Sequence, residues 1–90
     1  MNDEIVQHYL DNDGRLTLLP KKRSRRLAVL AWLAEQLPDG ELDEVSVNAA
    51  IQTHISFPDY VTARRDMVDA GYVTRTSNGR TYRRVIELDE

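Results

Sequence analysis

The residues with most capacity for chemistry in this sequence are basic residues gathered in two stretches. Five of the twelve form Lys-Lys-Arg-Ser-Arg-Arg at 21–26, and six more lie within 64–84, where only two aspartates oppose them. Concentrated cationic groups bind anions, and nucleic-acid phosphates are one such partner. Carboxylates of the same chain are the other, because acids fill 1–13 and 35–59 and the net charge is −3.

The two stretches supply a set of candidate nucleic-acid-binding residues. The first opens an expected helix, where its charges meet the positive end of the helix dipole at a cost in stability, which favours a function for it. The second lies largely on an expected hairpin, which could follow a phosphate backbone or a minor groove. The candidates are Lys21, Lys22, Arg23, Arg25, Arg26, Arg65, Arg75, Arg80, Arg83 and Arg84. Tyr82, which lies among them, is more typical of a core residue than of a stacking platform.

The sequence has no recognisable catalytic or metal-binding constellation. His8 and His54 are its only histidines, and it has no cysteine, no Gly-rich phosphate loop and no His-Glu-x-x-His motif. Asp11 and Asp13 lie in a turn before Gly14, but the other ligands of a calcium loop are missing. We therefore expect no enzymatic activity, no cofactor, no metal and no small-molecule ligand.

Length and composition predict one folded domain. Ninety residues with 41% hydrophobic and 30% charged residues suffice for one modest core. The longest apolar run, 27–34, is far shorter than the ~18 residues of a membrane span. The lack of cysteine and the acidic N-terminus favour a cytoplasmic location. We expect a single domain over 1–90 with its core at about 13–86, flanked by segments 1–10 and 87–90.

A first helix is predicted over about 24–37. Its main apolar face consists of Leu27, Leu30, Ala31, Leu33, Ala34 and Leu37, and Pro38-Asp39-Gly40 ends the pattern. Val29 and Trp32 lie off this face, so the helix is apolar around most of its girth. These two residues are candidates for a homodimer or partner surface, and burial beneath residues 5–10 is the alternative.

Two more helices are predicted further along the chain. One begins at Asp43 or Glu44 and places His54 on its apolar face, where we expect a hydrogen-bonded core histidine. The other runs over about 58–70, with proline in its first turn and Gly71 in the left-handed conformation after its end.

A hairpin and one further strand complete the predicted elements. Asn78-Gly79, flanked by β-type residues at 72–76 and 81–86, is a strong hairpin signal. Its two-residue loop predicts the cross-strand pairs Thr74 with Arg83 and Arg75 with Tyr82. A strand at 15–19, in which Leu16 and Leu18 alternate, is expected to join the hairpin in a three-stranded sheet. The order strand, three helices, hairpin predicts an α+β winged helix-turn-helix with the hairpin as its wing.

Several separate blocks of the sequence resemble the prokaryotic family catalogued as domain of unknown function 2087. The blocks span about 13–85 and are Asp13-Gly14-Arg15-Leu16, Leu19-Pro20-Lys21-Lys22-Arg23, Leu27-Ala28-Val29-Leu30-Ala31-Trp32-Leu33, Arg64-Arg65-Asp66-Met67-Val68-Asp69-Ala70-Gly71 and Gly79-Arg80-Thr81-Tyr82-Arg83. The resemblance implies a bacterial winged-helix domain, free-standing or attached to helix-turn-helix regulators. By association it implies transcription control, but it supplies no site residues.

The expected third helix argues against base-specific readout. In helix-turn-helix proteins such a helix enters the major groove. Here its expected solvent face carries Arg65 beside Asp59, Asp66 and Asp69, whose carboxylates repel phosphate. Arg64 falls beside the apolar face and is expected to pair with an acid of the preceding helix.

Two functions therefore stay open from the sequence. One is a DNA-binding or transcription-regulatory domain that contacts phosphates through the basic stretches with low specificity. The other is a non-catalytic protein-interaction module, with a protein partner or a second copy docking at Val29 and Trp32.

Overall fold

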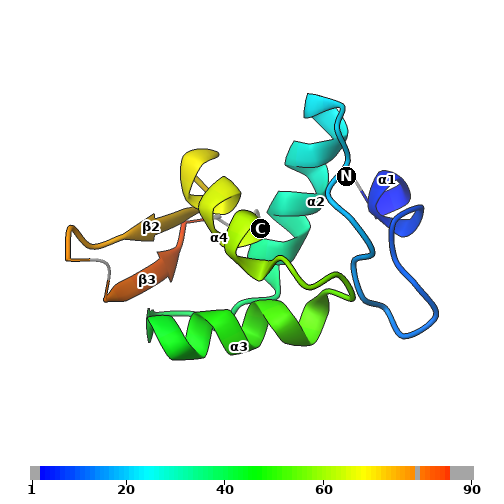
Figure 1. The fold of residues 1–90 in the computed structure, drawn as a ribbon. Helices are drawn as coiled ribbons and strands as arrows, with labels where there is room; N and C mark the ends of the chain where they lie inside the picture. The colour runs from blue at the N-terminus through cyan, green and yellow to red at the C-terminus, as the bar shows by residue number, and fades with distance from the viewer. Residues whose placement is uncertain (1–2, 79, 86–90) are drawn as a thin grey trace.

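The computed structural model describes residues 3–78 and 80–85, and within them the chain forms a mixed α+β domain. Four helices and a three-stranded antiparallel sheet follow one another as α1 (Asp3–Gln7), α2 (Arg23–Glu35), β1 (Glu41–Asp43), α3 (Glu44–His54), α4 (Tyr60–Asp69), β2 (Val73–Arg75) and β3 (Thr81–Arg84). The β2–β3 hairpin extends from the helices at the end opposite α1 (Figure 1). Gly79 of the predicted turn, Ile86 of the predicted strand and the flanking segment 87–90 lie outside the described residues.

The core is built around α2, whose apolar residues are buried on more than one side. Leu30 is 2% exposed and Leu33 is completely buried, as their helical spacing predicted. Met67 of α4 is also completely buried, and α4 packs against both α2 and α3. The three longer helices thus enclose one continuous core, as the sequence predicted.

Polar and glycine residues at the predicted positions fix the ends of α3 and α4. The Asp43 carboxylate accepts a hydrogen bond of 2.8 Å from the Ser46 backbone N–H, which caps α3. Asp59 caps α4 in the same way through Thr62. Gly71 has a φ of +85° after α4, a left-handed conformation that glycine adopts without steric cost. The predicted start of α3 and both predicted boundaries of α4 are correct to within two residues.

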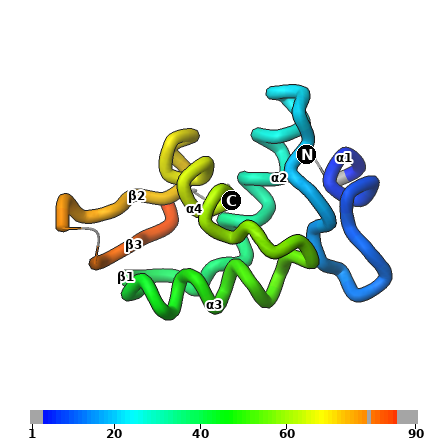
Figure 2. Tube along the Cα trace, in the orientation of Figure 1, coloured from blue at the N-terminus to red at the C-terminus, as the bar shows by residue number. Residues whose placement is uncertain are grey.

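The hairpin has the register that the sequence predicted, but its third strand is a different one. Thr74 pairs with Arg83 and Arg75 pairs with Tyr82. The strand beside β3 is β1, which gives the sheet order β1-β3-β2. Figure 2 shows β1 next to the start of α3, close to the hairpin.

The prediction of a strand at 15–19 that joins the hairpin was wrong. Leu16 forms only isolated bridges, to Leu10 and to Ile55, and Leu18 is 47% exposed. Leu16 itself is completely buried, so its apolar character serves the core without a sheet. Three-residue β1 is a strand only because it lies beside β3, and its sequence Glu-Leu-Asp carries no strand signal.

The N-terminal segment takes part in the fold as a fourth helix, where only a flanking segment was expected. Helix α1 packs against α2, and its Val6 is 2% exposed. Val29 of α2 is completely buried. The second apolar side of α2 is thus covered within one chain, which was the alternative to a partner surface.

Candidate nucleic-acid interface

The first basic stretch lies at the N-terminus of α2 with little local compensation. The N-cap residue, Lys22, makes no capping hydrogen bond through its side chain, and no acidic residue lies in the first turn of the helix. Lys21, Lys22, Arg23 and Arg25 are exposed there. Positive side chains at a positive helix end repel the backbone dipole, so this end of α2 favours an anionic partner.

Arg26, the remaining member of this stretch, is turned toward α4. Its Nε donates to Asp66 Oδ2 at 3.0 Å, its Nη2 also contacts that oxygen, and its Nη1 donates to the Pro20 carbonyl at 3.2 Å. The Asp66 side chain is 24% exposed. The predicted repulsion of phosphate by Asp66 is therefore reduced, because Arg26 neutralises the carboxylate, and Arg26 is a structural residue rather than a free cation.

Two of the hairpin arginines lie beside acids of this chain. Arg83 Nη2 lies 3.9 Å from Glu41 Oε2 across the sheet, with both side chains exposed. Arg84 Nη1 donates to the Glu35 carbonyl at 3.0 Å, and its Nε lies 3.8 Å from Asp39 Oδ1. With a side chain only 17% exposed, Arg84 satisfies the C-terminal end of α2 and offers less surface than the sequence predicted.

Three of the remaining basic residues of the second stretch line a cleft between α4 and the hairpin. The cleft has a volume of about 150 Å³, and Figure 1 shows α4 beside the base of the hairpin. We call it the arginine cleft, and its lining residues are Arg64, Arg65, Val68, Asp69, Arg75 and Tyr82. Arg65 and Arg75 are exposed, and neither forms an ion pair with another described residue. Three guanidinium groups against one carboxylate make the cleft a place for an anion.

Arg64 occupies the edge of the core, as its position beside the apolar face predicted. Its Nη1 donates to Asn48 Oδ1 at 2.6 Å and lies 3.5 Å from Glu44 Oε2, both on α3. Its guanidinium carbon is 5.7 Å from the centre of the Tyr82 ring. Tyr82 is 2% exposed, which confirms it as a core residue. The expected pair with an acid of the preceding helix is thus present. Arg64 also lines the arginine cleft.

His54 also has the structural role that its helical position predicted. Its Nδ1 lies 2.9 Å from the Ala50 carbonyl oxygen, and its ring meets that of Trp32 edge-on with centroids 6.3 Å apart. Trp32 is partly buried and packs against the core. Of the two residues predicted for a partner surface, only Trp32 retains exposed surface, because Val29 has none.

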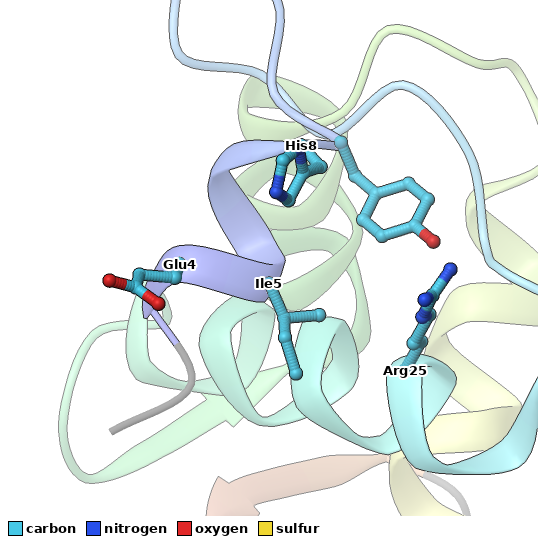
Figure 3. A pocket seen from close by; sticks show the side chains of 5 residues that line it. Glu4, Ile5, His8 and Arg25 are labelled. Atoms are coloured by element: carbon cyan, nitrogen blue, oxygen red, sulfur yellow. The ribbon is translucent and has the colours of Figure 1, made fainter.

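A larger pocket of about 450 Å³ lies on the other side of α2, next to α1. It is lined by Glu4, Ile5, His8, Tyr9 and Arg25, and Figure 3 shows the Glu4 carboxylate pointing away from the Arg25 guanidinium. No group of three His, Asp or Glu side chains within 3–78 and 80–85 is placed to hold a metal ion. Across the same residues, no helix has the length and apolar character needed to cross a membrane. The arginine cleft is the site with the clearest ligand preference.

The sequence pattern of one protein family matches residues 15–84, and the family is described as an uncharacterized protein conserved in bacteria, DUF2087. The protein belongs to this family. The match includes both basic stretches and every residue of the arginine cleft. Neither a search of curated proteins nor a search of solved structures gives a match.

In this DUF2087 domain, the charge pattern of the sequence pointed to only part of the arginine cleft. Arg65 and Arg75 were predicted as binding residues, and the structure brings them together with Arg64, which was assigned only a structural pair. A signal for Arg64 did exist, since Glu44 and Asn48 stand four residues apart and therefore share a face of α3. The convergence on one cleft could not be read from the chain, because it depends on how α4 packs against β2.

Proposed function

We propose that the domain is a winged helix-turn-helix that binds the phosphates of duplex DNA and takes part in the control of transcription. The helices α3 and α4 are joined by residues 55–59, in the manner of a helix-turn-helix pair. The first strand falls between α2 and α3 and pairs with the hairpin, so β2 and β3 form a wing next to α4. This arrangement supports the fold assignment.

The observation that carries the proposal is the convergence of Arg64, Arg65 and Arg75 between the second helix of the pair and the wing. These are the two elements that approach a duplex in proteins of this architecture. Arginine suits the task because its planar fork can donate two parallel hydrogen bonds to phosphate oxygens. Arg80, which precedes β3 in the hairpin, is also exposed.

The carboxylates around α4 set the expected specificity. Asp69 lines the arginine cleft, and Asp59 caps the N-terminus of α4, the end that reads bases in helix-turn-helix proteins. Carboxylates there oppose close approach to the phosphate-lined groove. We therefore propose phosphate contacts with little discrimination between DNA sequences.

The test is fluorescence anisotropy of a labelled random duplex at several salt concentrations. The wild-type chain should bind more weakly as salt rises, so that log affinity falls with log salt. The triple variant Arg65→Ala, Arg75→Ala, Arg80→Ala should make this negative slope shallower by as much as ~2.7. Arg15→Ala is the matched surface control, because it removes an exposed arginine outside both basic stretches. The absence of any binding by the wild-type chain at low salt would overturn the proposal.

A protein-interaction module is the second function that the sequence allowed, and it has less support. Val29 is completely buried, and Trp32 is partly covered, so the proposed docking surface is small. Sedimentation of the intact chain at high concentration tests this alternative for a second copy. A concentration-dependent mass that Trp32→Ala abolishes would favour the interaction role over DNA binding.

A further inference from the structure

Arg64 is fixed in place before any ligand arrives. Asn48 and Glu44 hold its Nη1 from one side, the Tyr82 ring lies against its guanidinium, and its side chain is 13% exposed. A side chain ordered by folding loses little additional rotamer freedom on binding. Arg64 is therefore better prepared to hold an anion than exposed Arg65 and Arg75, which a ligand would have to order.

The contacts that fix Arg64 leave most of its hydrogen-bond donors unused. A guanidinium group carries five N–H bonds, and both partners named above lie at Nη1. Nε and Nη2 of Arg64 have no hydrogen-bond partner among the described residues, and the side chain keeps 13% of its surface exposed. The arginine cleft, which Arg64 lines, is the opening through which an anion can reach them.

The size and charge of the cleft define the ligand. A volume of about 150 Å³ gives the cleft room for one phosphate group. Two exposed guanidinium groups at the rim can complete the coordination of its oxygens. The carboxylates of Asp69 in the lining and of Glu44 beside Arg64 offset two of the three positive charges, so the balance stays positive.

We propose that the arginine cleft is a preformed seat for one phosphate group of the DNA backbone, with Arg64 as the binding residue at its floor. Asn48 and Glu44 act as positioning residues that aim Nε and Nη2 of Arg64 at the phosphate oxygens. The assignment of the phosphate to DNA rests on the proposed function. The recognition of a phosphate group by the cleft does not depend on it.

The first experiment uses inorganic phosphate as the probe and the intact chain. Titration followed through the arginine Nε–Hε signals by NMR should give a saturable shift for Arg64, Arg65 and Arg75, with chloride at equal ionic strength as the reference. The Arg15 signal is the internal control, because Arg15 is an exposed arginine outside the cleft and outside both basic stretches. Chemical-shift changes that rise linearly and equally in all arginines would exclude a specific phosphate site in the cleft. The measurement uses the wild-type chain, so it does not depend on whether a variant folds.

Two variants separate binding from positioning. Arg64→Lys keeps the charge but loses the planar fork, and it should weaken phosphate binding about tenfold, the effect of one charge-assisted hydrogen bond. Asn48→Ala should weaken it about threefold to tenfold while Arg64 is still present. Urea unfolding of each variant shows that it is folded, and wild-type phosphate affinity in both folded variants would overturn the assignment of roles.

The DNA measurement distinguishes failure of the seat from failure of the proposed function. Saturable phosphate binding at Arg64 without any binding of duplex DNA supports the seat, assigns it to a free phosphate compound and overturns the DNA proposal. Salt-dependent DNA binding that Arg64→Lys leaves unchanged supports DNA binding and overturns the seat.

Discussion

Arg26 near the start of α2 and Asp66 on α4 form an ion pair across forty residues of sequence. Nε of Arg26 donates to Oδ2 of Asp66 at 3.0 Å, and Nη2 contacts the same oxygen, with side chains 31% and 24% exposed. A basic residue at a positive helix end is unfavourable by itself, and the carboxylate from α4 offsets this. The pair therefore joins the basic N-terminus of α2 to the helix that lines the arginine cleft.

Removing this pair should weaken the packing of α4 on α2. We expect a double-mutant cycle of Arg26→Ala and Asp66→Ala to give a coupling energy of about 1 kcal/mol, between the values for exposed and buried pairs. Urea unfolding of the four proteins measures it. Asp69→Ala is the matched control on the same helix and should change stability by less than about 0.5 kcal/mol. A coupling energy near zero would show that the contact does not hold the two helices together.

Leu30 of α2 and Leu18 of the segment predicted as a strand provide a test of the core packing. Leu30→Ala should lower the free energy of unfolding by about 2–5 kcal/mol, because it leaves a cavity in the centre of the domain. Leu18→Ala should change it by less than about 1 kcal/mol, because this side chain is 47% exposed. Similar losses in the two variants, measured by denaturant unfolding, would contradict the described packing of residues 15–19.

The aspartate caps should make the domain less stable in acid. Hydrogen bonds from the Ser46 hydroxyl and backbone N–H lower the pKa of Asp43 below its ordinary value of 3.8. Hydrogen bonds from Thr62 lower the pKa of Asp59 in the same way. A carboxyl group with a lowered folded pKa stabilises the fold above its unfolded pKa, and this contribution is lost as the pH falls through the folded pKa.

Asparagine at either cap keeps an oxygen acceptor but does not titrate. Asp43→Asn and Asp59→Asn should therefore fold nearly as stably as the wild type at neutral pH, and each should lose less stability on acidification to about pH 3. Urea unfolding at the two pH values measures the difference. Asp13→Asn is the control, since no hydrogen bond to the Asp13 carboxylate is present among the described residues. An acid response in the cap variants equal to that of the wild type would exclude the caps as its source.

Local sequence signals predicted the parts of the fold that depend on local chemistry. Asn78-Gly79 was enough to predict the pairing of Thr74 with Arg83, because a two-residue loop fixes the register of its strands. Local signals also placed the start of α3 at Asp43 or Glu44, and the helix begins at Glu44. Helix α1 was missed because five residues give too short a pattern for a helical period, although Val6 is as buried as Leu30.

Long-range packing decided the parts that the sequence could not predict. Leu16 looks like a strand residue, but it is buried through contacts with segments on either side of it, including Ile55. The partners of the charged residues also depend on long-range packing. Arg26 and Arg84 belong to basic stretches, but each contacts an aspartate that only the fold brings close. Charge clustering therefore identified the regions that can bind an anion, and the structure was needed to separate the occupied arginines from the accessible ones.

The last prediction follows from that separation and concerns the four arginines of the hairpin. Arg75 and Arg80 are exposed and form no ion pair with another described residue, whereas Arg83 and Arg84 lie beside Glu41 and Asp39. In binding to a random duplex, the double variant Arg75→Ala, Arg80→Ala should make the negative slope of log affinity against log salt shallower by about 1.8. The double variant Arg83→Ala, Arg84→Ala should make it shallower by less than about 1. The second variant should instead have the lower thermal unfolding midpoint, because Arg84 donates a hydrogen bond to the Glu35 carbonyl at the end of α2. Equal salt slopes for the two double variants would mean that phosphates displace the acids from Arg83 and Arg84, and that the whole hairpin binds as the charge pattern alone predicts.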